Sequence, residues 1–178
     1  MATLPVGHAG RGVVADLLLP KVGTMREYCN CQSLPAIATL IGEHDQVTDL
    51  IADTHEAYRQ GDVGAMVTLC EQMSAVLQPH TVVEEKGLFP AMALEFPEQI
   101  AILQSEHRRI EAVLAGATDG TARVDPAWPT RVIEAMSLLR RHIAKEQDGV
   151  FHAAVSILSN EQWNRLGEIR QALKLVSS

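Results

Sequence analysis

The sequence is poor in aromatic residues, which make up 4% of its 178 residues. Strands are enriched in aromatic side chains, whereas this chain relies on aliphatic residues and methionine, a composition that favours packed helices. It contains three cysteines, two of them in Cys29-Asn30-Cys31. Three cysteines do not make the disulfide framework on which small secreted domains depend. The composition therefore predicts an all-α protein that is held together by a hydrophobic core.

Long hydrophobic runs and excess positive charge are also missing. No run reaches the roughly 18 apolar residues of a membrane-spanning helix, and residues 13–20 are short for a signal-peptide core and contain Asp16. The 15 basic and 22 acidic residues give a net charge of −7, without the basic stripe that neutralises phosphates. We therefore expect a cytoplasmic protein with neither a membrane nor a nucleic acid as partner.

The length allows one well-buried domain and is short for two. Residues 1–32 show no sustained hydrophobic period, so we expect a loosely ordered leader that carries the Cys29 and Cys31 pair. Met25 is an alternative start of the chain. Residues 33–175 are expected to form the folded domain.

A motif that occurs twice is the most informative feature of the chain. A His-x3-Glu segment followed by glycine and phenylalanine at matching offsets occurs twice, about sixty residues apart, and each copy is preceded by a Glu-His pair some 35 residues upstream. A histidine and a glutamate four residues apart lie on the same face of a helix. The doubled unit comprises His44, His80, Glu84, His107, His142 and Glu146.

Hydrophobic periodicity predicts four long helices whose apolar stripes include these six residues. The expected segments are 33–60, with Ser33 as N-cap, 62–91 after an Asp62 cap, 96–114 and 129–153, with a polar loop over 116–128. Residues 159–162 form a capping-box pattern for a short fifth helix. The short connections predict an up-down-up-down four-helix bundle.

Six ionisable groups at the middle of apolar helix faces require a physical explanation. Burial of an unpaired carboxylate costs several kcal/mol, and two in one core would cost more. Two cations would convert these groups into ligands. Imidazole and carboxylate donors without thiolate suit iron or manganese, with zinc possible. We expect His44 and His80 on one metal, His107 and His142 on the other, and bridges from Glu84 and Glu146.

The alternative is a purely structural role for each residue. A single histidine on an apolar face is more often a hydrogen-bonded core residue, and a single His-x3-Glu is often a surface pair. A set of four histidines and two glutamates, repeated at matched spacing, is hard to obtain in that way.

With these motifs, residues 33–155 resemble a hemerythrin-like (HHE cation-binding) domain. The resemblance implies a four-helix bundle around a non-haem di-iron centre, with Glu84 as a bridge, and makes manganese or zinc less fitting than iron. Two departures stand out. Oxygen-carrying hemerythrins have a further histidine on the third helix, where this chain has Leu103 and Glu111 at the neighbouring turns, and their final His-x4-Asp motif would fall on Gln147. The pattern is closer to the symmetric variant with four histidines and two glutamates.

Several other residues lie near the expected ligands. Glu43, Glu85 and Glu106 are sequence neighbours of ligands and, turned by about 100° around the helix, are expected on the solvent side or behind the ligands. Glu111, one turn from His107, is the best additional ligand. A residue on the core face, Cys70, is expected to be an inert small hydrophobe.

The sequence leaves several functions open. A di-iron centre with an open position could bind or sense oxygen, nitric oxide or peroxide, or it could act as an enzyme that disproportionates peroxide or oxidises a small molecule. Iron handling is a weaker alternative, since one dinuclear site stores little metal. The expected partner is a small diatomic ligand or peroxide, and the sequence does not identify a protein partner.

Overall fold

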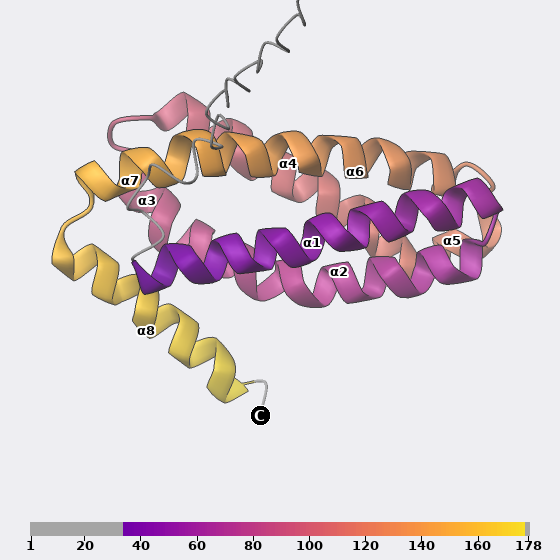
Figure 1. The fold of residues 1–178 in the computed structure, drawn as a ribbon, viewed down its shortest axis with the longest axis horizontal. Coiled ribbons are helices and arrows are strands. Elements are labelled where there is room, and N and C mark those ends of the chain that lie inside the picture. Colours follow the sequence, from indigo (N-terminus) through magenta and orange to yellow (C-terminus); the bar gives the residue numbers. More distant parts are fainter. Residues whose placement is uncertain (1–33, 177–178) are drawn as a thin grey trace, which may run out of the picture.

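The computed structural model describes residues 34–176, which contain helices and no strand. Four long helices lie side by side (Figure 1). They are α1 (Pro35–Gln60), α2 (Val63–Val83), α4 (Pro97–Leu114) and α6 (Trp128–Lys145). Helix α1 packs against α2 and α6, and α4 packs against α2 and α6, so the four surround a common interior. The expected all-α architecture is confirmed, and the alternating direction of the helices stays a prediction. The leader and its two cysteines lie outside the described residues.

The helix boundaries follow from local chemistry. The N-cap of α1 is Leu34, without a side-chain hydrogen bond, rather than the expected Ser33, because Pro35 occupies the first turn and fixes its backbone. The helix ends at Gly61, whose φ of 69° is in the left-handed region that glycine adopts most easily. The carboxylate of Asp62 then accepts a hydrogen bond from the backbone N–H of Ala65, at 2.9 Å, and caps α2 as expected.

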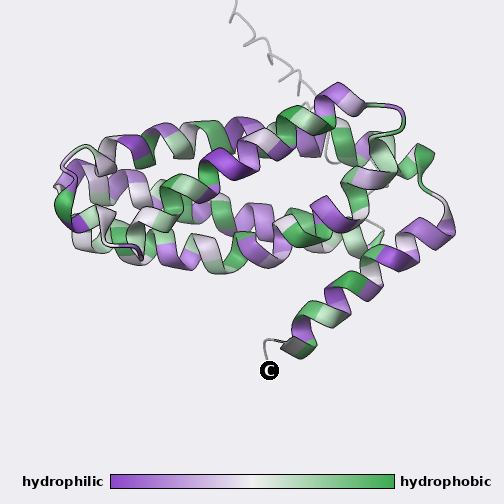
Figure 2. Cartoon of the chain, turned by 180° about the vertical axis from the view of Figure 1, so that it is seen from behind, coloured by the Kyte–Doolittle hydropathy of each residue, from purple (hydrophilic) through white to green (hydrophobic). Residues whose placement is uncertain are grey.

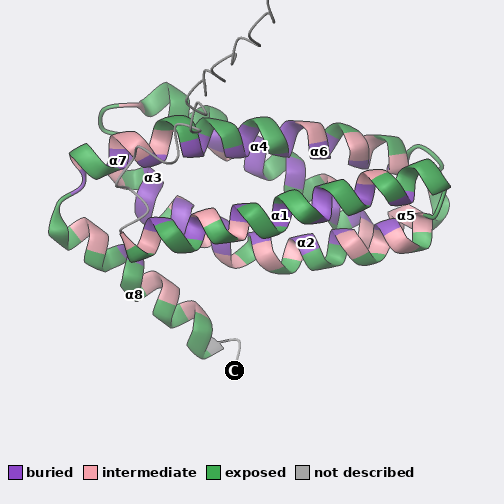
Figure 3. Cartoon of the chain, in the orientation of Figure 1, coloured by how far each residue is buried: buried purple, intermediate pink, exposed green. Residues whose placement is uncertain are grey.

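Two hydrophobic clusters fill the interior, and the candidate ligands lie between them. Along α1, Leu40 belongs to one cluster and Val47 to the other, with His44 between them. Along α4, Leu103 and Ile110 flank His107 in the same way. Hydrophobic and hydrophilic residues are interspersed along each helix (Figure 2). Buried residues likewise recur at intervals along the long helices, between exposed ones (Figure 3). The bundle therefore contains a polar layer sandwiched between two apolar cores.

Two short π-helical segments interrupt the bundle at equivalent places, which the sequence analysis did not foresee. Helix α2 continues into η3 (Glu84–Leu88) and α3 (Phe89–Met92), and α6 continues into η5 (Glu146–Val150) and α7 (Phe151–Ile157). Each π-helical segment begins at the glutamate of a His-x3-Glu motif and includes a glycine at its fourth position. Such segments are rare and occur frequently at functional sites.

The segment expected as a polar loop contains more structure than the sequence suggested. A 3₁₀ turn (Ala115–Ala117) and the short helix α5 (Thr121–Val124) occupy its first part. Trp128 is the first residue of α6 rather than a loop residue; it is 1% exposed, and its indole Nε1–H donates to the Val113 carbonyl at 3.2 Å. Burial of this large ring explains why the helix begins before Pro129.

The C-terminal helix α8 (Asn160–Val176) packs against η3, α2 and α1 and extends away from the bundle at its far end (Figure 1). The capping box is confirmed: the hydroxyl of Ser159 accepts from the Gln162 N–H, and the Gln162 side chain accepts from the Ser159 N–H. At 17 residues α8 is almost as long as α4, so it is not the short helix expected.

Among residues 34–176, no helix combines the length and the hydrophobicity that crossing a bilayer requires.

Candidate metal centre

The six residues predicted as ligands meet in the polar layer of the bundle. The four histidines come from the four long helices, and Glu84 and Glu146 are the first residues of η3 and η5. All six side chains are buried, and both glutamates are 0% exposed. Their ligand atoms form two groups, and the two glutamates belong to both. One group consists of His44, His80, Glu84 and Glu146, and the other of Glu84, His107, His142 and Glu146.

The distances within the first group match those between ligands of one metal ion. The Nε2 atoms of His44 and His80 are 3.1 Å apart, and Nε2 of His80 is 3.3 Å from Oε1 of Glu84. Nε2 of His44 is 3.2 Å from Oε2 of Glu146. Ligand bonds of about 2.1 Å place neighbouring donor atoms about 3 to 3.5 Å apart.

The second group repeats this geometry. Nε2 of His142 is 3.1 Å from Oε1 of Glu146, and Nε2 of His107 is 3.4 Å from Oε2 of Glu84. Each glutamate therefore directs one oxygen toward each histidine pair, as a carboxylate bridge requires. The expected division into two pairs joined by two glutamates agrees with this arrangement.

The oxygens of the two buried carboxylates lie near imidazole nitrogens but form no hydrogen bonds. Among the residues that the structure describes, none is a hydrogen-bond partner for the four oxygens of Glu84 and Glu146 or for Nε2 of His142, and all five atoms are buried. Native proteins pair almost all buried polar atoms, and an unpaired buried carboxylate costs several kcal/mol. Cations bound between these atoms would remove that cost. The residues present therefore fit a dinuclear metal centre.

Each imidazole directs Nε2 inward and holds its other nitrogen, Nδ1, against a residue on a neighbouring helix. These partners are the sequence neighbours of the candidate ligands, and they follow one another around the bundle. The Nδ1 contacts are His80 with Glu43 at 2.9 Å, His107 with Glu85 at 3.1 Å, His142 with Glu106 at 3.0 Å and His44 with Gln147 at 3.2 Å. A ligand histidine ordinarily donates its second N–H to such a partner, which fixes the ring and raises its basicity.

The ring of Nδ1 partners is carboxylate at three positions and amide at one. Gln147, where the oxygen carriers have a ligand, contacts Nδ1 of His44 and is absent from both ligand groups. The contact is made by the amide nitrogen of Gln147, which can only donate; if Nε2 of His44 held a metal, Nδ1 would carry the hydrogen, and the amide would have to turn so that its oxygen accepts it. Glu43 also accepts hydrogen bonds from Nη1 and Nη2 of Arg170 in α8, at 2.5 and 2.9 Å. Glu106 accepts a hydrogen bond from Nζ of Lys145 at 2.5 Å.

Two phenylalanines at equivalent positions of the repeat lie against two of the imidazoles. Phe89 stacks on His107 with a ring-centroid distance of 5.5 Å, and Phe151 stacks on His44 at 5.6 Å. Both phenylalanines are fully buried, so they restrict the ring planes of the histidines. Their recurrence five residues after each clustered glutamate is part of the repeat seen in the sequence, but their stacking on the imidazoles was not predicted from it.

Residues near the centre differ in how closely they approach it. A cavity of about 10 Å³ borders the four imidazoles, with Leu77, Ile110 and Leu139 as its apolar walls and Thr81 and Glu111 as its remaining polar side chains. Glu111 is exposed and is absent from both ligand groups, so the structure places it at the edge of the cavity rather than among the clustered atoms.

Other ionisable residues of the sequence lie away from the centre. Cys70 is buried in the core, and burial, followed by the charge of Glu71, raises the pKa of its thiol to about 12. The thiol is therefore protonated and unreactive at neutral pH, as expected. His152 belongs to neither group of clustered residues. Its Nδ1 atom lies 2.8 Å from the backbone carbonyl of Gln147 instead.

Comparison with protein families identifies the domain. A family model described as the hemerythrin HHE cation binding domain matches residues 36–154, which include all six clustered side chains. The chain belongs to the hemerythrin HHE cation-binding family. The resemblance inferred from the sequence is confirmed, and with it a metal-binding function. Comparisons with curated proteins and with solved structures found no match.

The imidazole of His80 and the carboxylate of Glu84 shift each other's pKa. Burial opposes the charged imidazole, but the charge of Glu84 and the hydrogen bond that His80 donates to Glu43 raise the pKa of His80 to about 10. Burial likewise opposes the Glu84 carboxylate, yet the charge of His80 holds its pKa well below the usual value. His80 and Glu84 are therefore expected to stabilise one another as an ion pair in protein from which metal has been removed.

Removal of the ligands should remove the metal. We expect the double variant His80→Ala, Glu84→Ala to lower the metal content from about two ions per chain to less than about one, because both groups share Glu84. The measurement is elemental analysis of protein purified with iron supplementation. Glu111→Gln is the matched control, and a similar loss of metal in that variant would instead make Glu111 a ligand.

The Nδ1 partners should control metal affinity. Glu106→Gln should weaken metal binding by about 10- to 100-fold in chelator competition, because His142 loses a carboxylate acceptor. Glu98→Gln, at an exposed position of the same helix, provides the control and should leave affinity unchanged. Equal affinities for the two variants would show that the contact at Nδ1 does not tune the centre.

The pH dependence of stability should differ between metal-free and metal-loaded protein. A folded-state pKa of about 10 for His80, above its ordinary 6.5, means that its contribution is complete below pH 6.5 and is lost as the pH rises toward 10. The urea midpoint of chelator-treated protein should fall across this window. Metal keeps the imidazoles neutral, so the fall should disappear in metal-loaded protein; identical profiles would contradict this account.

Proposed function

We propose that this hemerythrin-family protein holds two non-haem iron ions and uses them to bind or sense oxygen, nitric oxide or peroxide. The observation that carries the proposal is that two histidine pairs share two fully buried glutamates whose four oxygens have no hydrogen-bond partner. His44 and His80 would hold one ion, and His107 and His142 the other. Manganese or zinc would fit the same donors less well than iron, given the imidazole and carboxylate set and the family.

The small cavity beside the imidazoles supports a small ligand. Its volume of about 10 Å³ is close to that of one water-sized probe, and Leu77, Ile110 and Leu139 form apolar walls. When bound, the two ions would supply electrons and an open coordination position for a diatomic ligand or peroxide. The apolar walls would exclude larger polar molecules and limit the access of bulk water to that position.

The Nδ1 partners make the two metal positions chemically unequal. Both imidazoles of the His107 and His142 pair contact carboxylates, whereas His44 contacts the neutral amide of Gln147. A carboxylate partner makes an imidazole a stronger donor, which favours the more highly charged oxidation state of its metal. The Nδ1 partners of His107 and His142 would therefore favour the higher oxidation state of an ion held by these two histidines more than the partners of His44 and His80 would for an ion held there.

A peroxide-disproportionating enzyme is the second candidate, favoured by two polar side chains besides the imidazoles that line the cavity. They are Thr81, which is buried, and Glu111, which is exposed. Glu111 could deliver a proton and Thr81 could orient the bound oxygen atoms. The binding function and the enzymatic function use the same metal-centre residues. Catalytic turnover of peroxide therefore distinguishes them.

The deciding measurement combines visible spectroscopy with gas release after peroxide is added to iron-loaded protein. For a binding or sensing protein we expect a stable absorption band and no sustained oxygen evolution, and nitric oxide should give a similarly persistent spectrum under anaerobic conditions. Sustained oxygen evolution that falls in Glu111→Gln would favour the enzyme. Neither a spectral change nor gas release, in protein with about two irons per chain, would contradict both functions.

A further inference from the structure

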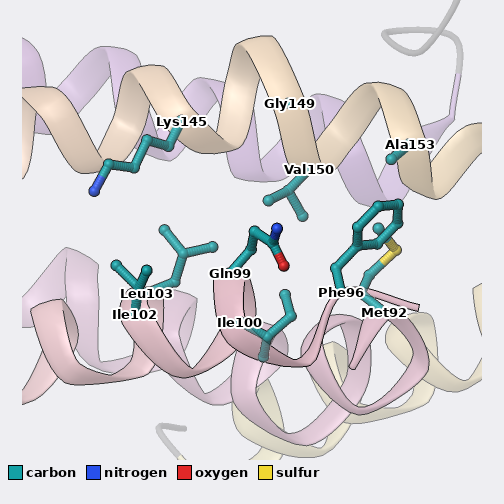
Figure 4. A pocket seen from close by; sticks show the side chains of 10 residues that line it. All are labelled: Met92, Phe96, Gln99, Ile100, Ile102, Leu103, Lys145, Gly149, Val150 and Ala153. Carbon is teal, nitrogen blue, oxygen red and sulfur yellow. The ribbon is translucent and has the colours of Figure 1, made fainter. Parts of the chain in front are cut away.

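A groove of about 470 Å³ lies between α4 and the segment formed by η5 and α7, outside the metal centre. Figure 4 shows Lys145 at one end of it and Phe96 with Met92 at the other, with Gln99 and Val150 between them. Lys145 and Gln99 bring the only polar side chains of the lining, which is otherwise apolar. A preformed, mostly apolar concavity with a few polar groups is the usual character of a small-molecule site.

The first half of the internal repeat has an equivalent surface beside η3, and helix α8 covers it. On the other side of the bundle, η3 faces α8, and a Cβ atom added to Gly87 would lie 3.1 Å from Cδ1 of Ile169 and 3.2 Å from Cγ of Leu166. Gly149 is the equivalent residue of η5, and a Cβ added there would meet nothing within 4 Å. The chain thus fills one groove with branched aliphatic side chains and leaves its counterpart open.

The charges beside the two grooves also correspond. In the filled groove, α8 brings Arg170, which pairs with Glu43. In the open groove the equivalent carboxylate, Glu106, is already paired with Lys145 of α6. An occupant of the open groove therefore has no carboxylate to neutralise. Instead it meets the ammonium group of Lys145, whose side chain is 47% exposed; the group has three N–H donors, and Glu106 accepts from one of them.

We propose that this groove binds a small amphipathic molecule with an aliphatic body and one anionic head group, as in a medium-chain carboxylate. The body occupies the space over Gly149 that Leu166 and Ile169 occupy over Gly87, and reaches toward Phe96 and Met92. The head group binds the free donors of Lys145. None of the six clustered residues lines the groove, so the proposal does not rest on the function proposed above, although Lys145 also pairs with Glu106, the Nδ1 partner of His142.

The test measures the binding of decanoate to the full-length protein by titration calorimetry, with and without metal. We expect saturable binding of one decanoate per chain. Gly149→Leu should weaken it by about tenfold or more, because Gly149 lines the groove and a Cβ atom added there meets nothing within 4 Å, which leaves the new side chain to occupy the space of the ligand. Ala153→Phe, at another lining position, should have the same effect and guards against a local distortion of η5.

Head-group recognition is tested with Lys145→Met. Loss of a partly exposed ion pair should weaken decanoate binding by about two- to fivefold and leave decanol binding unchanged. Arg141→Met removes an exposed cation from the same helix outside the groove and should leave decanoate binding unchanged. Lys145→Arg should retain it.

Three results would overturn the proposal. The first is the absence of saturable decanoate binding. The second is unchanged binding in both Gly149→Leu and Ala153→Phe while their circular dichroism and metal content remain native. The third is tighter binding of a peptide with the sequence of residues 160–176, with displacement of decanoate, which would make the groove a seat for a helix rather than for a small acid.

Discussion

The burial of Glu84 and Glu146 at one level of the bundle is the constraint on which the rest of the structure depends. Burial raises the pKa of Glu146, the charge of Glu84 raises it further, and only the surrounding imidazoles bring it below its usual value. Four histidines from four helices must therefore arrive at the same height. The helices accordingly meet in register at this layer, and hydrophobic packing above and below it becomes two separate clusters.

The surroundings of the centre serve the same constraint. The π-helical segments begin at the two glutamates, and the phenylalanines that follow hold two of the imidazole rings in place. The Nδ1 partners link each helix to the next around the bundle, so displacement of one helix would disturb a ligand on its neighbour. Through Arg170 and Glu43 this linkage extends to α8, which connects the outermost helix with the orientation of His80.

Much of this arrangement could be predicted from the sequence, because a 3.6-residue period and a His-x3-Glu spacing fix which residues share a helix face. The helices and the convergence of six side chains followed from that rule. The π-helical segments did not, since a one-residue change of hydrogen-bond register leaves little trace in composition, apart from the repeated Gly87 and Gly149. Glu43 was expected on the solvent side or behind the ligands, and it lies behind His80. The histidine that it contacts, and the contact of Gln147 with His44, could not be predicted, because they depend on how neighbouring helices are rotated. The burial of Trp128 could not be predicted from its local sequence, because it depends on contacts with distant residues such as Val113.

The repeat has a consequence for the ancestry of the fold. Residues 35–92 and 97–154 each supply two long helices, two of the clustered histidines, one of the clustered glutamates and one π-helical segment, in the same order. Two identical helical hairpins related by a two-fold axis would generate the same centre, since a self-complementary pair contributes every residue twice. Away from the centre the halves differ in their connections, because Gly61 and Asp62 join α1 to α2, whereas a longer segment with α5 joins α4 to α6. Among the four Nδ1 partners, the asymmetry is limited to Gln147, an amide where the other three positions have carboxylates.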